Sequence, residues 1–311
     1  MANVVLILGN GFDVDLGLKS KYTDFINEEE WKKLCKGLIS KFPDKFKQVS
    51  LLYHMQKAGE DPSLWFDVEN EIYKYINANA FHENDSLKRI GQLSQSEFRL
   101  LREALYNYLQ RISNEFEIKE EKWSYILLKT LIESSNKVNV YTFNYTNSCA
   151  LCKLPEIDFT YIHGSLDDSD IVLGCEGKGR EYIPEPFSFM LKSNMISRPN
   201  NIIEKLYKAN EVIFFGHSLN EFDFPYFKEF FEYICQPIDH ELHLTFITKD
   251  EKSELDIRNN LHAQGIPVQN LFKSNIETTF IHSAPNDSAK AKEQDKFDTL
   301  LKRISRDHLI T

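Results

Sequence analysis

The 311-residue sequence lacks a long hydrophobic run, since no apolar stretch approaches the roughly 20 residues that a membrane-spanning helix needs. It also lacks a positively charged N-terminal segment followed by a long apolar one, which is the pattern of a secretory signal. Both absences argue against membrane insertion and export. We therefore expect a cytoplasmic protein that does not bind membranes.

Cysteine is scarce: the chain has five, an odd number that does not suit a framework of disulfides. Cys149 and Cys152 form a single C-x-x-C pair, whereas a zinc site needs a second pair of ligands at usable spacing, and none follows. We therefore expect no metal. The spacing instead predicts two buried cysteines on one face of a helix.

Positive charge is in deficit, because 37 Lys and Arg against 47 Asp and Glu give a formal net charge of −10. A broad surface for nucleic acid needs clustered basic residues, so we expect no general nucleic-acid binding. Apolar and aromatic residues are plentiful, with 42% hydrophobic residues, 23 Phe and 14 Tyr. A chain of this length and composition can bury a large core and fold without disulfides or metals.

Near the N-terminus, the sequence NVVLILGNGFDVDLGL at residues 3–18 indicates a buried strand that runs into a glycine-containing turn. Glycines in such a loop let the backbone come close to a nucleotide. Asp13 and Asp15, however, place two carboxylates where a phosphate would lie. Two arrangements stay open for Asp13: it contacts a ribose or a bound water, or it caps the following helix so that no phosphate binds. For Asp15 we expect a solvated or capping carboxylate.

Between residues 22 and 135 the apolar periodicity is almost wholly helical. One predicted helical face consists of Trp65, Val68, Ile72 and Ile76. Ser94 followed by Glu97 resembles a capping box at the start of another helix. We interpret residues 21–135 as a helical lobe inserted into an α/β domain formed by residues 1–20 and 136–311.

After residue 136, short apolar runs alternate with polar helical segments, which predicts a doubly wound, mostly parallel sheet. With the first strand at residues 4–8, the predicted strands lie at residues 138–143, 159–164, 171–174, 211–216, 242–248 and 278–282. Ligands of such sheets bind at the carboxyl ends of the strands. Polar and glycine residues follow four of these strands, at residues 8–13, 143–148, 162–166 and 215–223. We expect them to converge on one pocket.

Four motifs in a fixed order carry a resemblance to known families. The glycine loop at 9–17, TFNYT at 142–146, IHGS at 162–165 and FFGHSLNEFD at 214–223 are similar to the nucleotide-binding motifs of sirtuins. The chain resembles the AbiH family of bacteriophage abortive-infection proteins more closely, since its GNGFD…GL, FNYT, HG and GHSL…D signatures occur here nearly verbatim. The likeness to AbiH covers most of the chain, and the likeness to sirtuins covers only the nucleotide-binding core.

The resemblance implies a sirtuin-like Rossmann sheet that binds NAD+, with a large helical insertion. It implies catalytic roles for His163, whose imidazole can accept a proton near neutral pH, and for Asn144, whose amide can position water or a ribose hydroxyl. A satisfied core histidine and an asparagine that only ties down a strand end are the structural alternatives. The resemblance assigns nucleotide contacts to Gly9, Asn10, Gly11, Phe12, Asp13, Thr142, Tyr145, Gly216, His217, Ser218, Asn220 and Asp223. For His217, helix capping or packing is the alternative.

Sirtuins carry an Asp where this chain has Thr146, and their zinc module with two C-x-x-C pairs is missing here, so deacylation of proteins is not expected. The resemblance implies an antiviral protein that hydrolyses NAD+ to nicotinamide and ADP-ribose. Two alternatives are a nucleotide-sensing or partner-binding defence module without turnover, and an enzyme acting on another nucleotide-like substrate. The sequence leaves open a phage-derived trigger, a protein partner and a homo-oligomer.

Overall fold

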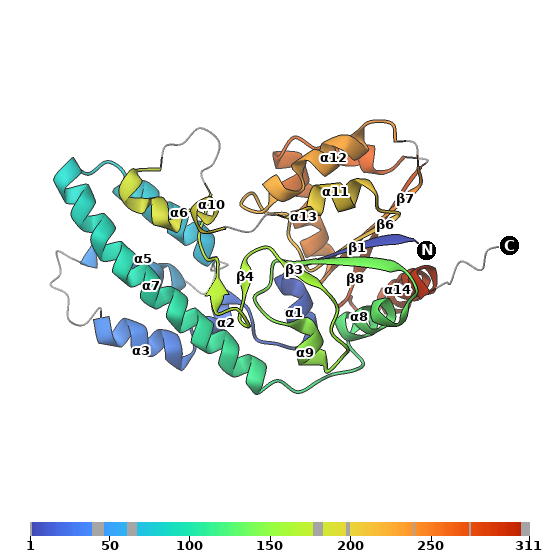
Figure 1. Cartoon of the computed structure of the whole chain (residues 1–311), viewed down its shortest axis with the longest axis horizontal. Coiled ribbons are helices and arrows are strands. Elements are labelled where there is room, and N and C mark those ends of the chain that lie inside the picture. The colour runs from blue at the N-terminus through green and yellow to red at the C-terminus, as the bar shows by residue number, and fades with distance from the viewer. Residues whose placement is uncertain are drawn as a thin grey trace. The chain divides into compact units, whose positions relative to one another are not determined.

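The computed structural model describes residues 2–38, 47–60, 67–176, 183–196, 200–238, 240–273 and 275–305. The chain forms two compact units, each assembled from separate stretches of sequence (Figure 1). The sheet unit consists of residues 1–18, 116–162 and 199–311, and the helical unit consists of residues 19–115 and 163–198. In the described part of the chain, no helix combines the length and the apolar character that a bilayer crossing requires. Trp65 of the predicted helical face lies outside the described residues.

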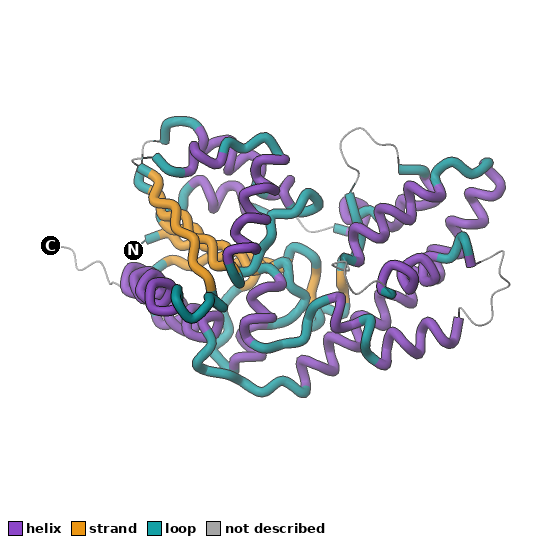
Figure 2. Tube along the Cα trace, turned by 180° about the vertical axis from the view of Figure 1, so that it is seen from behind, coloured by secondary structure: helices purple, strands orange, loops and turns teal. Residues whose placement is uncertain are grey.

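Six strands, each parallel to its neighbours, make the central sheet in the order β3-β2-β1-β6-β7-β8. Figure 2 draws the strands in orange. They are β1 (Asn3–Leu8), β2 (Lys137–Thr142), β3 (Phe159–Tyr161), β6 (Glu211–Phe215), β7 (Leu242–Thr248) and β8 (Ile276–His282). Numbered along the chain within the sheet, this order is 3-2-1-4-5-6, the order of Rossmann dinucleotide-binding folds. The predicted doubly wound parallel sheet is confirmed.

Helices cover both faces of this sheet. One face packs against α1 (Asn10–Leu16), α8 (Trp123–Glu133), α9 (Ser148–Cys152) and α14 (Lys290–Ser305). The other packs against α11 (Ile202–Tyr207), α12 (Lys228–Cys235), α13 (Glu251–Ala263) and the short 3-10 helices η3 (Phe224–Tyr226) and η4 (Val268–Leu271). Because β1 is covered on both faces, all five residues of its VVLIL run are buried.

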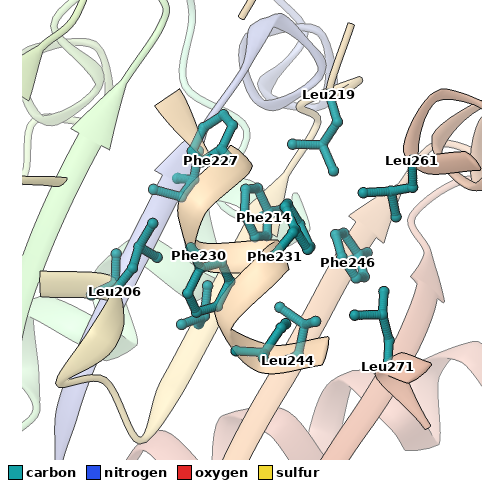
Figure 3. Packing of buried hydrophobic residues seen from close by; sticks show 14 of the residues in the cluster. Leu206, Phe214, Leu219, Phe227, Phe230, Phe231, Leu244, Phe246, Leu261 and Leu271 are labelled. Atoms are coloured by element: carbon teal, nitrogen blue, oxygen red, sulfur yellow. The ribbon is translucent and has the colours of Figure 1, made fainter. Parts of the chain in front are cut away.

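Stacked phenylalanines form much of the core on the α12 face (Figure 3). The ring of Phe214 on β6 stacks on Phe246 of the neighbouring β7, with ring centroids 5.2 Å apart, and on Phe231 of α12 at 5.9 Å. Aromatic pairs of this kind add about 0.5–1.5 kcal/mol beyond the burial of their area. This packing fixes β6, and with it the loop that follows the strand.

The helical unit contains α2 (Tyr22–Phe25), α3 (Glu29–Leu38), α5 (Leu51–Gly59), α6 (Val68–Asn79), α7 (Asn84–Asn114), α10 (Lys192–Met195), η2 (Glu185–Met190) and a hairpin of β4 (Gly164–Ser165) and β5 (Asp170–Ile171). Residues Val68, Ile72 and Ile76 are buried on α6, as their spacing predicts. The helical character predicted for residues 22–135 is confirmed for the described residues.

The predicted capping box at Ser94 and Glu97 is wrong, because both residues lie in the middle of the 31-residue α7. The Ser94 hydroxyl donates to the carbonyl of Ile90 one turn earlier, at 2.7 Å. Glu97 instead accepts from the Ser50 hydroxyl and from the Leu51 backbone N–H, both at 2.7 Å, and so supports the start of α5. This capping partner comes from another helix and has no local sequence pattern.

Two segments group differently from the expected domain boundaries. Helix α8 belongs to the sheet unit, because its apolar residues Leu127, Leu128 and Leu131 join the core on the sheet face that also packs against α1 and α14. Residues 163–198 belong to the helical unit. Within them, the predicted sheet strand at 171–174 is wrong: its first residue ends β5, which pairs antiparallel with β4 outside the main sheet.

Candidate functional site

The candidate site in the sheet unit lies at the carboxyl ends of β1, β2 and β6. Strand β1 pairs with β2 on one side and with β6 on the other, so the direction of winding reverses between β1 and β6. Ligands of doubly wound sheets bind at this switch point. Three segments contribute residues here: Gly9–Asp13 after β1, which includes the first turn of α1, Phe143–Thr146 after β2, and Gly216–Asp223 after β6.

Two glycines after β1 allow that loop to contact the loop after β6. The Gly11 N–H donates to the Gly216 carbonyl at 2.9 Å. A Cβ at Gly11 would lie 2.5 Å from the Gly216 Cα, and one at Gly9 would lie 2.6 Å from the Cα of His217, which is closer than real Cβ contacts come. The backbone that approaches these glycines is therefore the protein's own, whether or not a nucleotide also binds there.

Backbone N–H groups in the first turn of α1 are engaged within the protein. The Gly9 N–H donates to the Phe215 carbonyl at 3.0 Å, the Gly11 N–H to Gly216, and the Phe12 N–H to the Gly9 carbonyl at 2.9 Å. In nucleotide-binding loops, amides at this position bond the phosphate. Here those three donors are already paired.

Neither of the two acidic residues caps α1. The N-cap of α1 is Gly9, with no side-chain cap, so the alternative in which Asp13 caps α1 is wrong. Asp15 accepts from the backbone N–H and the hydroxyl of Ser124 at 3.0 and 2.8 Å, in the first turn of α8. Asp15 therefore supports the start of α8, which is distant in the sequence, and does not cap its own helix.

Asp13 is the centre of a buried polar network. Its Oδ1 accepts from Asn144 Nδ2 at 3.0 Å, and its Oδ2 lies 2.5 Å from the Thr146 hydroxyl. Only 1% of Asp13 is exposed. Burial raises the pKa of Asp13 from 3.8 to about 7, although the bonds from Thr146 and Asn144 act in the opposite direction. The carboxyl group thus titrates near neutral pH.

This network fixes the orientation of the Asn144 amide. One Nδ2 hydrogen is directed at Asp13 and the other at the Gly9 carbonyl, which lies 3.1 Å away. The backbone N–H of Asn144 donates to the Thr142 hydroxyl at 3.0 Å. Among the described residues, none donates to Asn144 Oδ1. The oriented amide therefore has its carbonyl oxygen left as an acceptor at the switch point.

His217 is packed among aromatic rings in the loop after β6. Its ring lies 4.4 Å from that of Phe143 and 5.1 Å from that of Phe227, measured between centroids. Its Nδ1 accepts from the Leu219 backbone N–H at 3.0 Å, and its Nε2 lies 4.0 Å from Asp223 Oδ2. These contacts give His217 a packing role and assign the ring proton to Nε2.

Other residues predicted to contact the nucleotide have varied surroundings. Phe12 is fully buried against Phe215, while Asn10, the first residue of α1, is exposed. Tyr145 is buried. Asn220 Oδ1 accepts from the Phe222 and Asp223 backbone N–H groups, both at 3.0 Å. The exposed Ser218 accepts from Asn260 Nδ2 through its carbonyl, at 2.9 Å.

His163, the other predicted catalytic residue, belongs to the helical unit, whereas Asn144 belongs to the sheet unit. His163 is 3% exposed, and its Nε2 lies 3.4 Å from Lys192 Nζ. Lys192 is also buried and pairs with Glu69 Oε2 at 2.8 Å. The helical unit thus places a carboxylate, an ammonium and an imidazole in one buried cluster.

The local backbone explains the HG motif. Gly164 has φ +77°, and a Cβ there would lie 1.9 Å from the Asp170 carbonyl oxygen, so the β4–β5 hairpin requires glycine. The Val172 N–H donates to the His163 carbonyl at 2.7 Å, which anchors the histidine to the same hairpin. Lys192 is anchored in turn, because its N–H donates to the Cys175 carbonyl at 3.0 Å.

Lys192 and Glu69 are not among the residues that the sequence predicts for the site. A lysine inside the apolar segment FSFMLK was a usable signal for Lys192, whereas Glu69 resembles any acidic residue in the first turn of a helix. Both cysteines of the C-x-x-C pair are buried on α9, as predicted. In the described residues, no group of three or more His, Cys, Asp or Glu side chains is placed to hold a metal ion.

Together, the sheet order and the polar residues at its switch point define a doubly wound α/β protein whose chain also forms a second, helical unit. A family model described as bacteriophage abortive infection AbiH matches residues 5–242. The chain therefore belongs to the AbiH family. Comparisons with curated proteins and with solved structures gave no match.

Proposed function

We propose that this AbiH protein defends against phage by hydrolysing NAD+ to nicotinamide and ADP-ribose. The observation that supports this most is the oriented amide of Asn144 at the switch point of a sheet with the Rossmann strand order. Membership of an abortive-infection family supports the biological role. The likeness of the motifs to those of sirtuins supports the choice of NAD+ as the substrate.

In the proposed reaction, the glycosidic bond breaks and its electron pair leaves with neutral nicotinamide, so positive charge develops on the ribose. Water then adds to the ribose carbon and releases a proton. Asn144 Oδ1 would accept a hydrogen bond from this water or from a ribose hydroxyl, because both Nδ2 hydrogens are already directed at Gly9 and Asp13. An oriented acceptor acts by positioning the reacting groups. We also propose a role in the reaction for His163, which belongs to the helical unit.

A second function has one observation in its favour. Because Gly9, Gly11 and Phe12 use their N–H groups within the protein, the loop after β1 offers few donors to a pyrophosphate. A module that senses a nucleotide or binds a partner without turnover is compatible with this arrangement. An enzyme whose substrate carries fewer phosphates than NAD+ is also compatible with it.

Nicotinamide release tests the proposal. Purified full-length protein is incubated with NAD+, and nicotinamide is quantified by chromatography. Asn144→Ala should lower the rate by about 10²-fold, the usual cost of removing one preorganised polar group from an active site. The matched control is Asn210→Ala, because Asn210 also bonds backbone through its amide, to Asn3 at the start of β1, away from the carboxyl ends. Circular dichroism melting curves show whether both variants are folded.

Each outcome decides between the functions. Nicotinamide release that falls in Asn144→Ala but not in Asn210→Ala supports hydrolysis at this site. Binding of NAD+ without nicotinamide supports the sensing module. A folded protein that neither binds nor cleaves NAD+ contradicts both. For the second residue, His163→Ala is compared with His54→Ala, because His54 lies in the same unit and contacts a carboxylate at 3.1 Å.

A further inference from the structure

An ion pair is buried beside the ring of His163. Lys192 is 1% exposed, Glu69 is 7% exposed, and their charged atoms are 2.8 Å apart. Burying two charges is costly, and a well-packed apolar pair in the same place is often as stable or more stable. The pair is therefore not explained by stability alone. Its ammonium also lies 3.4 Å from His163 Nε2, so the pair can act on the ring.

The proton chemistry of this contact is asymmetric. An ammonium has three donors and no acceptor, and the adjacent carboxylate of Glu69 favours the charged form of Lys192. Nε2 of His163 can therefore form a hydrogen bond with the Lys192 ammonium only as an acceptor, through its lone pair. We propose that the Lys192–Glu69 pair holds His163 as a neutral imidazole with its single proton on Nδ1, so that Lys192 is a positioning residue.

Two other histidines in the chain have the opposite arrangement. Nε2 of His54 lies 3.1 Å from a carboxylate oxygen of Glu71, so its Nε2 carries a proton. Nδ1 of His217 accepts a backbone N–H, which also assigns the proton to Nε2. The structure thus contains two internal references for the tautomer opposite to that of His163.

One consequence rests on the proposed function. The lone pair of His163 faces an ammonium, so protonation of the ring would break that contact and place two cations 3.4 Å apart. In the proposed reaction, His163 is then a neutral hydrogen-bonding group and not the general base. His163→Asn, which cannot take up a proton at neutral pH, should therefore lower nicotinamide release by less than the about 10²–10⁴-fold that loss of a general base costs.

Nitrogen NMR tests the tautomer without any substrate, so its result is independent of NAD+ hydrolysis. The full-length protein is labelled with ¹⁵N-histidine, and long-range ¹H–¹⁵N correlations show which ring nitrogen of each of the nine histidines carries the proton. His163→Gln and His54→Gln assign the two key signals. We expect the proton on Nδ1 for His163 and on Nε2 for His54.

Removing the ammonium completes the test. In Lys192→Met, the His163 signals should change from the Nδ1–H pattern towards the Nε2–H pattern, while those of His54 stay constant. If this variant does not fold, Lys192→Met combined with Glu69→Gln removes both charges and serves the same purpose. A wild-type His163 with its proton on Nε2, a doubly protonated ring, or an unchanged pattern without Lys192 would overturn the proposal.

Discussion

Replacing Asp13 by asparagine should make the sheet unit less sensitive to pH. The amide has the same shape as the carboxyl group, so its oxygen can accept from Asn144 Nδ2 and its nitrogen can donate to the Thr146 hydroxyl. Both bonds of the buried network are then kept. Asp13→Asn removes only the ionisable carboxyl group, whose charged form is unfavourable in this buried position.

The expected magnitude follows from the pKa of Asp13, which burial raises from 3.8 to about 7. Between these two values the folded protein binds more protons than the unfolded chain, so the free energy of unfolding falls as the pH rises. At about 1.4 kcal/mol per pH unit, the full effect is about 4 kcal/mol and is complete just above pH 7. Between pH 5 and pH 8, the advantage of Asp13→Asn over wild type should therefore grow by about 2–3 kcal/mol.

Urea unfolding at pH 5 and pH 8 measures this difference. Both proteins carry Trp31→Phe and Trp65→Phe, so that fluorescence reports on Trp123, whose ring stacks on Phe297 in the sheet unit. Other titrating groups are common to both proteins and cancel in the comparison. Nicotinamide release from the same samples shows whether the carboxylate is also needed for the proposed reaction.

Parallel pH profiles for the two proteins would refute the reasoning, because they would mean that Asp13 titrates alike in the folded and unfolded states. An advantage of Asp13→Asn that shrinks as the pH rises would show a folded-state pKa below the unfolded one. That result would indicate that the hydrogen bonds from Asn144 and Thr146 outweigh the burial of Asp13.

Two further changes test other contacts by thermal or urea unfolding. Gly11→Ala should lower the free energy of unfolding by about 1–3 kcal/mol, because the new Cβ would lie 2.5 Å from the Gly216 Cα. The control is Gly37→Ala in helix α3, where an added Cβ would meet nothing within 4 Å. This control should raise the free energy of unfolding by up to about 1 kcal/mol. Equal effects would contradict the close approach of the two loops. Glu97→Ala should cost about 1–3 kcal/mol, because the buried Leu51 N–H loses its acceptor. A neutral result would show that water replaces the carboxylate.

Much of the sheet could be predicted from the sequence, because strands buried on both faces give continuous apolar runs. The VVLIL run of β1 and the run of β7 at 242–248 are of this kind, and both lie in the sheet. The run IVLG at 171–174 has the same composition, but it begins in the short β4–β5 hairpin. Composition alone cannot distinguish these cases, because pairing partners are set by tertiary structure.

The residue types of the candidate site could be read from the sequence, but their contacts could not. The GNG and FNYT motifs contain Gly11, Asp13 and Asn144, and strand order explains why these residues lie together. Which backbone approaches Gly11 depends on a strand that begins 200 residues later. The ion pair of Lys192 with Glu69 spans 123 residues and has no spacing rule behind it.

The central position of β1 has a consequence for folding during synthesis. Val4 pairs with Val138 on one side and with Glu211 on the other, so both neighbours of the first strand are made much later. At about 5–20 residues per second, the 207 residues that separate Val4 from Glu211 take about 10–40 s to synthesise. For about the first 7–27 s, until Val138 follows 134 residues after Val4, the VVLIL segment is an unpaired apolar strand, the kind of segment that associates with other chains, and one of its edges stays open until Glu211 is made. Production of this protein should therefore respond strongly to translation speed and to chaperones that shield its N-terminus.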